Sequence, residues 1–295
     1  MNAEETEEQG YESGEEVAQE PHLTILQAFG LMILLLVLQL ILAKCLEWFK
    51  LSYLTEMHWV GISLTHALSG LLTAQAGAIL AGLSIFGLLS SGRFQFMLLL
   101  PLTIAGFGIT ILASELGNVL HAISPVPKEY VEFLNQLFNQ NLWGVLFAVG
   151  VVAPVVEELI FRGVILDGLQ IRYPARTALF VSSFLFGAIH IIPWAIINAF
   201  LLGLFFAWLR IKTRSLPLCI YIHSFYNSLP FLLSAYFPVN IPGFNNTPGE
   251  IVQFQPWWFD LLGVVLLALG IGGIRALYIP PLEESPQLQD TEQPG

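Results

Sequence analysis

The stretch LWGVLFAVGVVAPVVEELIFR, residues 142–162, decides the fold class of this chain. It is apolar over the roughly 20 residues that a helix needs to cross a lipid bilayer. Two adjacent glutamates, Glu157 and Glu158, and one arginine, Arg162, lie inside this run. Ionisable side chains at membrane depth are costly and rare, and they face a bundle interior or a water-filled cavity. The stretch therefore predicts a membrane helix that carries a functional site.

The composition of the chain supports a membrane protein. Of the 295 residues, 55% are hydrophobic and 11% are charged, whereas soluble domains carry about 25% charged residues. The formal net charge of −11 comes from the two ends, since residues 1–22 hold eight of the 22 acidic residues and residues 280–295 hold four. Neither end contains Lys or Arg, and 10 acidic residues remain against 11 basic ones in between. The core between the ends is nearly neutral.

Apolar runs predict an all-α, polytopic helix bundle of about eight transmembrane helices with a four-helix core. The expected spans are 23–49, 66–90, 94–116, 142–173, 177–192, 194–209, 216–237 and 257–277. The fifth and sixth spans are short and are separated by Pro193, which predicts a tight helical hairpin or a broken pair.

This division gives five regions along the chain. They are a disordered acidic tail (1–22), three N-terminal transmembrane helices with their loops (23–141), the four-helix core (142–237), an outer loop with the last transmembrane helix (238–279) and a second disordered acidic tail (280–295).

The basic residues of the loops test the number of spans. With eight spans, seven fall on one side of the membrane: Arg93, Arg172, Arg176, Arg210, Lys212, Arg214 and Arg275. Three fall on the other side: Lys44, Lys50 and Lys128. Because Lys and Arg are enriched in cytoplasmic loops, we expect both termini in the cytoplasm.

The polar cluster of the fourth span divides into a pair and a single residue. Residues four apart share a helical face, so Glu158 can pair with Arg162. Glu157 is turned away by about 100° and has no cation in reach on its own helix. A carboxylate in this position is suited to take a proton from water as a general base. The alternative is a buried ion pair beside a spectator glutamate.

Two further motifs lie in other spans of the core. FGAIH, residues 186–190, places His190 near the end of the fifth span, and HSFYN, residues 223–227, places His223 and Asn227 on one face of the seventh. Polar groups at membrane depth face the bundle interior, so the three spans should bring these side chains together. For the other histidines, His22, His58, His66 and His121, we expect an interfacial, structural role.

A cavity with one carboxylate, two imidazoles and an amide can hold and activate a water molecule. Glu157 would take the proton of the water and His190 would orient it. His223 and Asn227 could donate hydrogen bonds to the oxyanion that forms when a carbonyl is attacked. This chemistry is the hydrolysis of an amide bond.

A metal ion is an alternative use of the same residues. Glu157, His190 and His223 would be its ligands, with Asn227 beside them, and zinc is the first choice because a bound divalent ion activates water. The zinc motif His-Glu-x-x-His is absent from the sequence. We therefore prefer water activation without a metal and expect no required cofactor.

The three motifs together resemble the CPBP intramembrane proteases, also called the CAAX protease and bacteriocin-processing, or Abi, family. The resemblance rests on Glu-Glu-x-x-Phe-Arg (157–162), Phe-x-x-x-His (186–190) and His-x-x-x-Asn (223–227), and it makes 142–237 the catalytic core. It implies a membrane-embedded endopeptidase. By analogy with the eukaryotic CAAX prenyl endopeptidase, Glu157 and His190 would activate water, His223 and Asn227 would form the oxyanion site, and Glu158 and Arg162 would support them. Members are often labelled metalloproteases.

The resemblance leaves the substrate open. The eukaryotic relative removes the last three residues of prenylated proteins, so substrates cleaved near a prenylated or lipid-associated C-terminus are one possibility. Expected partners are membrane lipids and a protein or peptide in or at the membrane, with no nucleic acid, and the expected location is a prokaryotic plasma membrane. The alternative functions are a non-catalytic membrane scaffold or immunity protein and a proton-coupled transporter, although the repeats typical of transporters are absent from the sequence.

Overall fold

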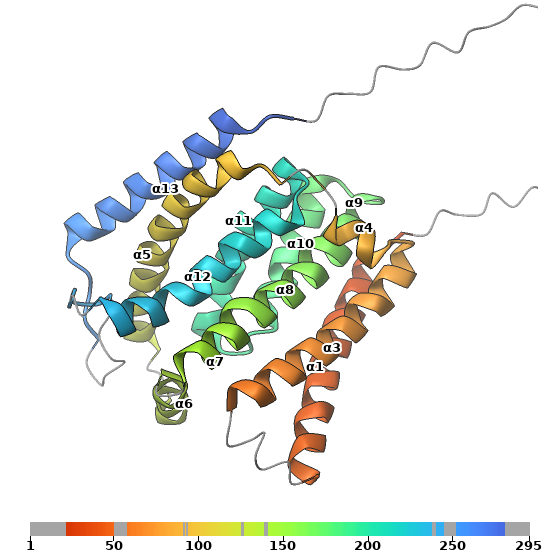
Figure 1. Cartoon of the computed structure of the whole chain (residues 1–295), viewed down its shortest axis with the longest axis horizontal. Helices are drawn as coiled ribbons and strands as arrows, with labels where there is room; N and C mark the ends of the chain where they lie inside the picture. The colour runs from red at the N-terminus through yellow and green to blue at the C-terminus, as the bar shows by residue number, and fades with distance from the viewer. Residues whose placement is uncertain are drawn as a thin grey trace, which may run out of the picture.

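The structure, a computed structural model, describes residues 22–49, 58–90, 92, 94–124, 127–138, 141–237, 240–244 and 252–280. The expected disorder of the two acidic tails falls outside these residues, apart from His22 and Pro280. The elements of the described chain are all helical (Figure 1), which confirms the all-α fold class.

Seven helices of the described chain are long and apolar enough to cross a membrane, and a shorter apolar helix is the eighth expected segment. The long helices are α1 (Ile25–Trp48), α3 (His58–Ala81), α5 (Leu99–Ile123), the composite helix 142–170, α11 (Pro193–Thr213), α12 (Leu216–Tyr236) and α13 (Trp257–Leu277). The shorter one is α10 (Ala175–Ala188), and the remaining elements are α4 (Ile85–Leu89), η1 (Phe96–Leu98) and α6 (Lys128–Phe138). The chain is an integral membrane protein with a polytopic helix bundle.

Several boundaries differ from the expected ones. The second helix covers His58–Ala81 rather than 66–90, because the chain turns at Gly82, which has φ +65°. A left-handed glycine is a common end of a helix. The third helix extends to Ile123 rather than 116. The fifth ends at Ala188, so His190 lies in the turn after the helix and not inside it.

The two short spans form a helical hairpin, one of the two expected arrangements. Ile191 between them has φ +61°, and Pro193 begins α11. A Cβ atom on Gly187 would lie 2.9 Å from the Ile196 oxygen, and one on Gly203 would lie 3.1 Å from Ser183. The two contacts run in opposite directions along the chain, so α10 and α11 are antiparallel and closely packed.

The composite helix carries the two glutamates and is not a regular α-helix. Its parts are α7 (Leu142–Phe147), the π-helical turn η2 (Ala148–Val152), α8 (Ala153–Glu158), the π-helical segment η3 (Leu159–Leu166) and α9 (Asp167–Gln170). π-Helical turns are rare and occur frequently at functional sites. Pro154, just after η2, has no N–H and cannot continue the regular hydrogen-bond ladder. The glutamates therefore lie between two widened stretches of helix.

α3 runs parallel to the composite helix and touches it closely. A Cβ atom on Gly70 would lie 1.8 Å from Val156 Cγ1, and one on Gly77 would lie 2.5 Å from Val164 Cγ1. Only glycine leaves room for such an approach at these positions. In Figure 1, α1 and α3 lie on one side of the composite helix, and α5 and α13 lie beyond α12 on the other. The composite helix is thus central in the bundle.

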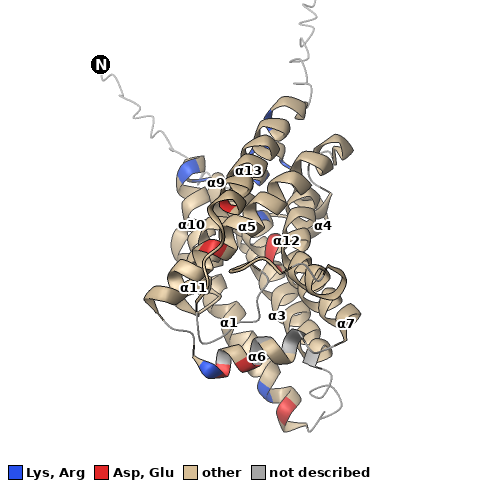
Figure 2. Cartoon of the chain, turned by 90° about the vertical axis from the view of Figure 1, so that its left-hand side faces the viewer, with Lys and Arg blue, Asp and Glu red and all other residues tan. Residues whose placement is uncertain are grey.

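Both ends of the described chain lie at the same end of the bundle. His22 Nε2 is 2.6 Å from Arg172 Nη1, and Gln95 Nε2 donates a hydrogen bond of 2.8 Å to the Ile279 oxygen. Figure 2 shows basic segments at this end, near α9 and α13, and on α6 at the opposite end. This placement agrees with an even number of crossings.

Candidate active site

Arg162 is fully buried and holds the predicted ion pair. Its Nη1 donates to Glu158 Oε1 at 3.0 Å, and its Nη2 donates to the Gly203 oxygen at 3.2 Å. The guanidinium also lies over the rings of Phe186, at 4.3 Å, and Phe206, at 5.2 Å. The pairing expected from the spacing of four residues is confirmed. Both side chains are completely buried, so each supplies the charge that the other needs away from water.

His223 connects the two glutamates. Its Nδ1 lies 2.8 Å from Glu158 Oε1, and its Nε2 lies 3.7 Å from Glu157 Oε2. Because an ionised carboxylate only accepts hydrogen bonds, Nδ1 carries the proton that is donated to Glu158. The ring stacks on Phe206 at 4.9 Å. The two glutamates, expected to point in directions about 100° apart, approach the two nitrogens of one imidazole.

Asn227, one turn after His223 on α12, contacts the composite helix through its backbone. Its Nδ2 donates to the Val149 oxygen at 3.0 Å. Val149 lies in the π-helical turn η2, in which each N–H bonds to the carbonyl oxygen five residues earlier, as Ala153 N does to the Ala148 oxygen. In this pattern the donor for the Val149 oxygen would be residue 154, which is a proline without an N–H. The Asn227 amide therefore replaces a missing backbone donor, and one of its two N–H groups is left for other partners.

His190 approaches the site through an aromatic ring. Its Nδ1 donates to the Phe186 oxygen at 2.9 Å, and its ring packs edge-on against the Phe186 ring at 5.2 Å. His223 packs against the same ring at 5.6 Å. Neither of these His190 contacts is with Glu157. The structure thus joins His223 to the Glu158–Arg162 pair by a hydrogen bond and places Glu157 3.7 Å from the same imidazole. His190 lies across Phe186 from them.

His66 on α3, for which an interfacial, structural role was expected, also faces Glu157. Its Nε2 lies 3.9 Å from Glu157 Oε1. A pattern in the sequence could have indicated this contact: Gly70 and Gly77, the first of them one turn after His66, form the face of α3 that packs against the composite helix. His66 lies on the same helical face as these glycines. Of the other histidines expected to be structural, His121 packs against Trp194 with 5.6 Å between ring centroids.

The described residues contain no group of three or more His, Cys, Asp and Glu side chains that could hold a metal ion. The ligand set considered for zinc, Glu157, His190 and His223, is not gathered into such a group. The arrangement of these three side chains does not fit a metal centre.

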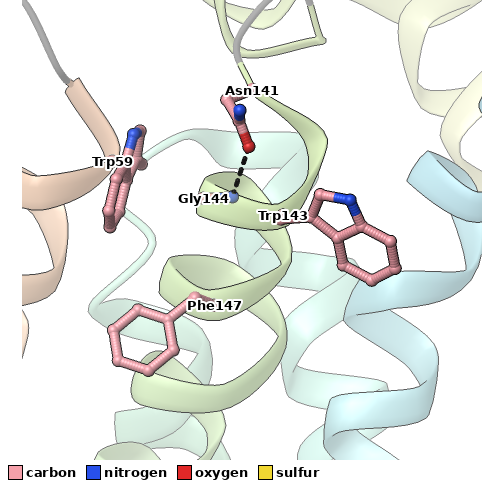
Figure 3. A pocket seen from close by; sticks show the side chains of 5 residues that line it. All are labelled: Trp59, Asn141, Trp143, Gly144 and Phe147. Atoms are coloured by element: carbon pink, nitrogen blue, oxygen red, sulfur yellow. Dashed lines mark hydrogen bonds between the residues drawn. The ribbon is translucent and has the colours of Figure 1, made fainter.

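A cavity of about 450 Å³, open to the surface, lies between α3 and α7, at the N-terminal ends of the two parallel helices. Its lining residues are Trp59, Asn141, Trp143, Gly144 and Phe147. Figure 3 shows Trp59 and Phe147 on the side of α7 that faces α3, with Trp143 on the other side. Trp59 precedes His66 by two helical turns, so the mostly apolar cavity lies along the same helix as the site.

Comparison with known proteins gives a match to the segment that carries this site. Residues 139–229 match the family described as type II CAAX prenyl endopeptidase Rce1-like. No curated protein matches the chain. The matched segment begins just before α7 and ends within α12, so it contains all three motifs, whereas α3 and His66 lie outside it. This match agrees with the resemblance of the three motifs to the CAAX protease, or CPBP, family, and it covers residues 139–229 of the 295.

Proposed function

We propose that this protein is an intramembrane endopeptidase of the CAAX protease type, in which Glu157 is the general base. The observation that carries the proposal is the contact of His223 with both glutamates. Glu158 is neutralised by Arg162 and fixes one nitrogen of the imidazole, while the other nitrogen lies 3.7 Å from Glu157. Glu157 is left with no guanidinium partner in this cluster. The family match to residues 139–229 supports hydrolysis of a peptide bond.

Water activation is the first step of the proposed reaction. The Nδ1 of His190 donates to Phe186, so its Nε2 is the nitrogen that can accept a hydrogen bond from the water. Glu157 takes a proton from the water, and the resulting hydroxide attacks the carbonyl carbon of the substrate. A C–O bond forms, and the carbonyl oxygen becomes an oxyanion. The proton then passes from Glu157 to the leaving nitrogen as the C–N bond breaks.

The oxyanion needs hydrogen-bond donors. Asn227 offers the N–H that Val149 does not use. His223 can donate from Nε2 only as an imidazolium, because its Nδ1 proton is already directed at Glu158. Glu157, which has no guanidinium partner in this cluster, would be the counter-charge of that form. Donors held in place in this way stabilise an oxyanion without reorganisation.

For the substrate, we propose a membrane-associated protein or peptide cleaved near a prenylated or lipid-associated C-terminus. The cavity between α3 and α7 is the proposed place for its apolar part, since tryptophan and phenylalanine side chains line it. Membrane lipids are the other expected partner, no cofactor is required, and no nucleic acid is involved. We place both termini in the cytoplasm of a prokaryotic cell, with the protein in the plasma membrane, because the loop Lys and Arg residues favour that orientation.

The test uses the full chain in lipid nanodiscs and two peptides whose fourth-last residue is cysteine. The peptides differ only in whether this cysteine carries a prenyl group. Mass spectrometry then detects a released tripeptide. Cleavage of the prenylated peptide supports the proposal, and preference over the other peptide supports the proposed substrate. If neither peptide is cleaved, reconstituted vesicles are assayed for solute uptake. Uptake that Glu157→Gln abolishes would establish a transporter instead, and a protein that neither cleaves nor transports would be a scaffold.

A further inference from the structure

Glu157 lies between imidazoles from two different helices. Its Oε2 faces His223 Nε2 on α12 at 3.7 Å, and its Oε1 faces His66 Nε2 on α3 at 3.9 Å. Each oxygen of the carboxylate therefore faces a different imidazole. His223 belongs to the segment that matches the protease family, whereas His66 is about 70 residues before that segment begins.

The packing of α3 fixes where His66 lies. Gly70, one turn after His66, meets Val156, the residue before Glu157, so closely that an added Cβ would be 1.8 Å from Val156 Cγ1. Side chains of a helix lean toward its N-terminus. Because the two helices are parallel, the Glu157 side chain leans back toward the level of His66. The short distance between His66 and Glu157 therefore follows from the tight packing of the two helices, and not only from the conformation of a flexible side chain.

The accessibility of the two side chains is consistent with a contact that orients Glu157. The His66 side chain is 30% exposed and the Glu157 side chain is 11% exposed. A separation of 3.9 Å exceeds a direct hydrogen bond. A shift of less than about 1 Å would close it to hydrogen-bond distance, or one water molecule could bridge the two groups. Either arrangement leaves Glu157 Oε2 directed at the site.

We propose that His66 is a positioning residue for the general base. Its Nε2–H donates to Glu157 Oε1, directly or through water, and this holds Oε2 toward the water molecule that attacks the substrate. His66 keeps its protons during the reaction, since the proton of the water goes to Oε2 and then to the leaving nitrogen. This inference rests on the proposed function and adds α3 to the catalytic arrangement.

The first experiment replaces His66 by phenylalanine, which keeps an aromatic ring and removes the donor. We expect kcat to fall by about 10- to 100-fold, as when a group that orients a ligand is removed, with KM changed by less than about twofold. His66→Gln, which restores a donor near the position of Nε2, should regain most of the activity. The measurement is steady-state cleavage of the prenylated peptide.

Two matched variants report ordinary damage to the bundle. Ser69→Ala removes the hydrogen bond from Ser69 Oγ to the Thr65 oxygen (2.6 Å) on the same helix α3. His121→Phe makes the same exchange of side chain on α5, against Trp194. Both should keep the wild-type kcat. A wild-type kcat in His66→Phe, an effect on KM alone, or an equal loss in Ser69→Ala would overturn the proposal.

A second readout separates this proposal from the proposed function. The midpoint of thermal unfolding, Tm, is measured for His66→Phe, for Glu157→Gln and for the double variant. If the two side chains interact, the shifts in Tm are not additive, whatever reaction the protein performs. If the protein cleaves no peptide but the shifts are non-additive, the proposed function fails and the contact stands. Additive shifts would overturn the role of His66 even in an active protease.

Discussion

The bundle has two regions that are held together in different ways. α5 and α13 pack through glycines, since a Cβ atom on Gly108 would lie 2.5 Å from Leu267 N and one on Gly270 would lie 2.5 Å from Ala105. The composite helix meets α12 through buried ionisable groups instead, with Glu158 joined to both Arg162 and His223. Buried charges are expensive compared with close apolar packing. A region that retains them is where function is expected.

Regularity of the backbone differs in the same way. α5 and α13 are continuous α-helices. Glu115 on α5 links them, because its Oε2 accepts hydrogen bonds from Asn118 Nδ2 on the same helix and from Gln255 N just before α13, each at 2.9 Å. The composite helix changes register twice within Ala148–Leu166. We therefore expect Glu115 to maintain the fold, whereas Glu157 is the residue proposed to act as the base. Four predictions test this difference, from the largest expected effect to the smallest.

Glu157→Gln should abolish peptide cleavage, a loss of at least about 100- to 10,000-fold in kcat, because an amide cannot accept the proton of water. The same exchange in the other region, Glu115→Gln, should leave kcat unchanged and lower Tm. Both values are obtained from purified protein in nanodiscs. If correctly folded Glu157→Gln still cleaves the peptide, Glu157 is not the general base.

Glu158→Gln and Arg162→Ala should lower folded yield and Tm more than they alter the chemistry of the protein that survives. Removal of one partner of a buried ion pair costs about 3–5 kcal/mol, because the other charge is left without compensation. Size-exclusion profiles and Tm measure the loss. A well-folded but inactive Glu158→Gln would instead show that the two adjacent glutamates share the catalytic role.

Two glycine substitutions compare the regions directly. Gly270→Ala forces a methyl group against the backbone of Ala105 on α5, and Gly70→Ala forces one against Val156 beside Glu157. Overpacking of this kind costs about 1–3 kcal/mol, so both variants should have a lower Tm. Only Gly70→Ala should also lower kcat, because it moves α3, and His66 with it, away from Glu157. Equal effects of both variants on kcat would remove the distinction between the regions.

Metal removal should have the smallest effect. The described residues offer no cluster of three or more His, Cys, Asp and Glu side chains suited to a metal ion. We expect the cleavage rate of protein prepared at low metal content to be unchanged by phenanthroline. Loss of cleavage that zinc restores would contradict this expectation and favour a metal-assisted reaction.

The sequence predicts the parts of this site that depend on local spacing. The pairing of Glu158 with Arg162 and the shared face of His223 and Asn227 follow from four-residue spacing, which a helix makes into contact. The all-α bundle follows from the length of the apolar runs. The three motifs also sufficed to recognise the protease family that residues 139–229 match.

The remaining features depend on contacts between distant segments. His66 meets Glu157 only because α3 packs in parallel against the composite helix, and no local pattern fixes which helices are neighbours. The approach of both glutamates to His223 arises in a helix whose register is widened on either side. The boundary at Gly82 depends on one left-handed residue. Spacing arguments for an ideal helix cannot anticipate any of these.

The hydrogen bond from Asn227 to the Val149 oxygen holds α12 against the composite helix. If α12 tilted away from the composite helix, this carbonyl would lose its donor, and a buried carbonyl without a donor is costly. On the opposite flank, α3 meets the composite helix at Gly70 and Gly77 through side-chain atoms of valine. Separation there leaves the backbone ladder of each helix intact. Opening on the flank of α3 would keep the hydrogen bond between Asn227 and Val149, and a peptide that entered by that route would pass His66 before it reached Glu157.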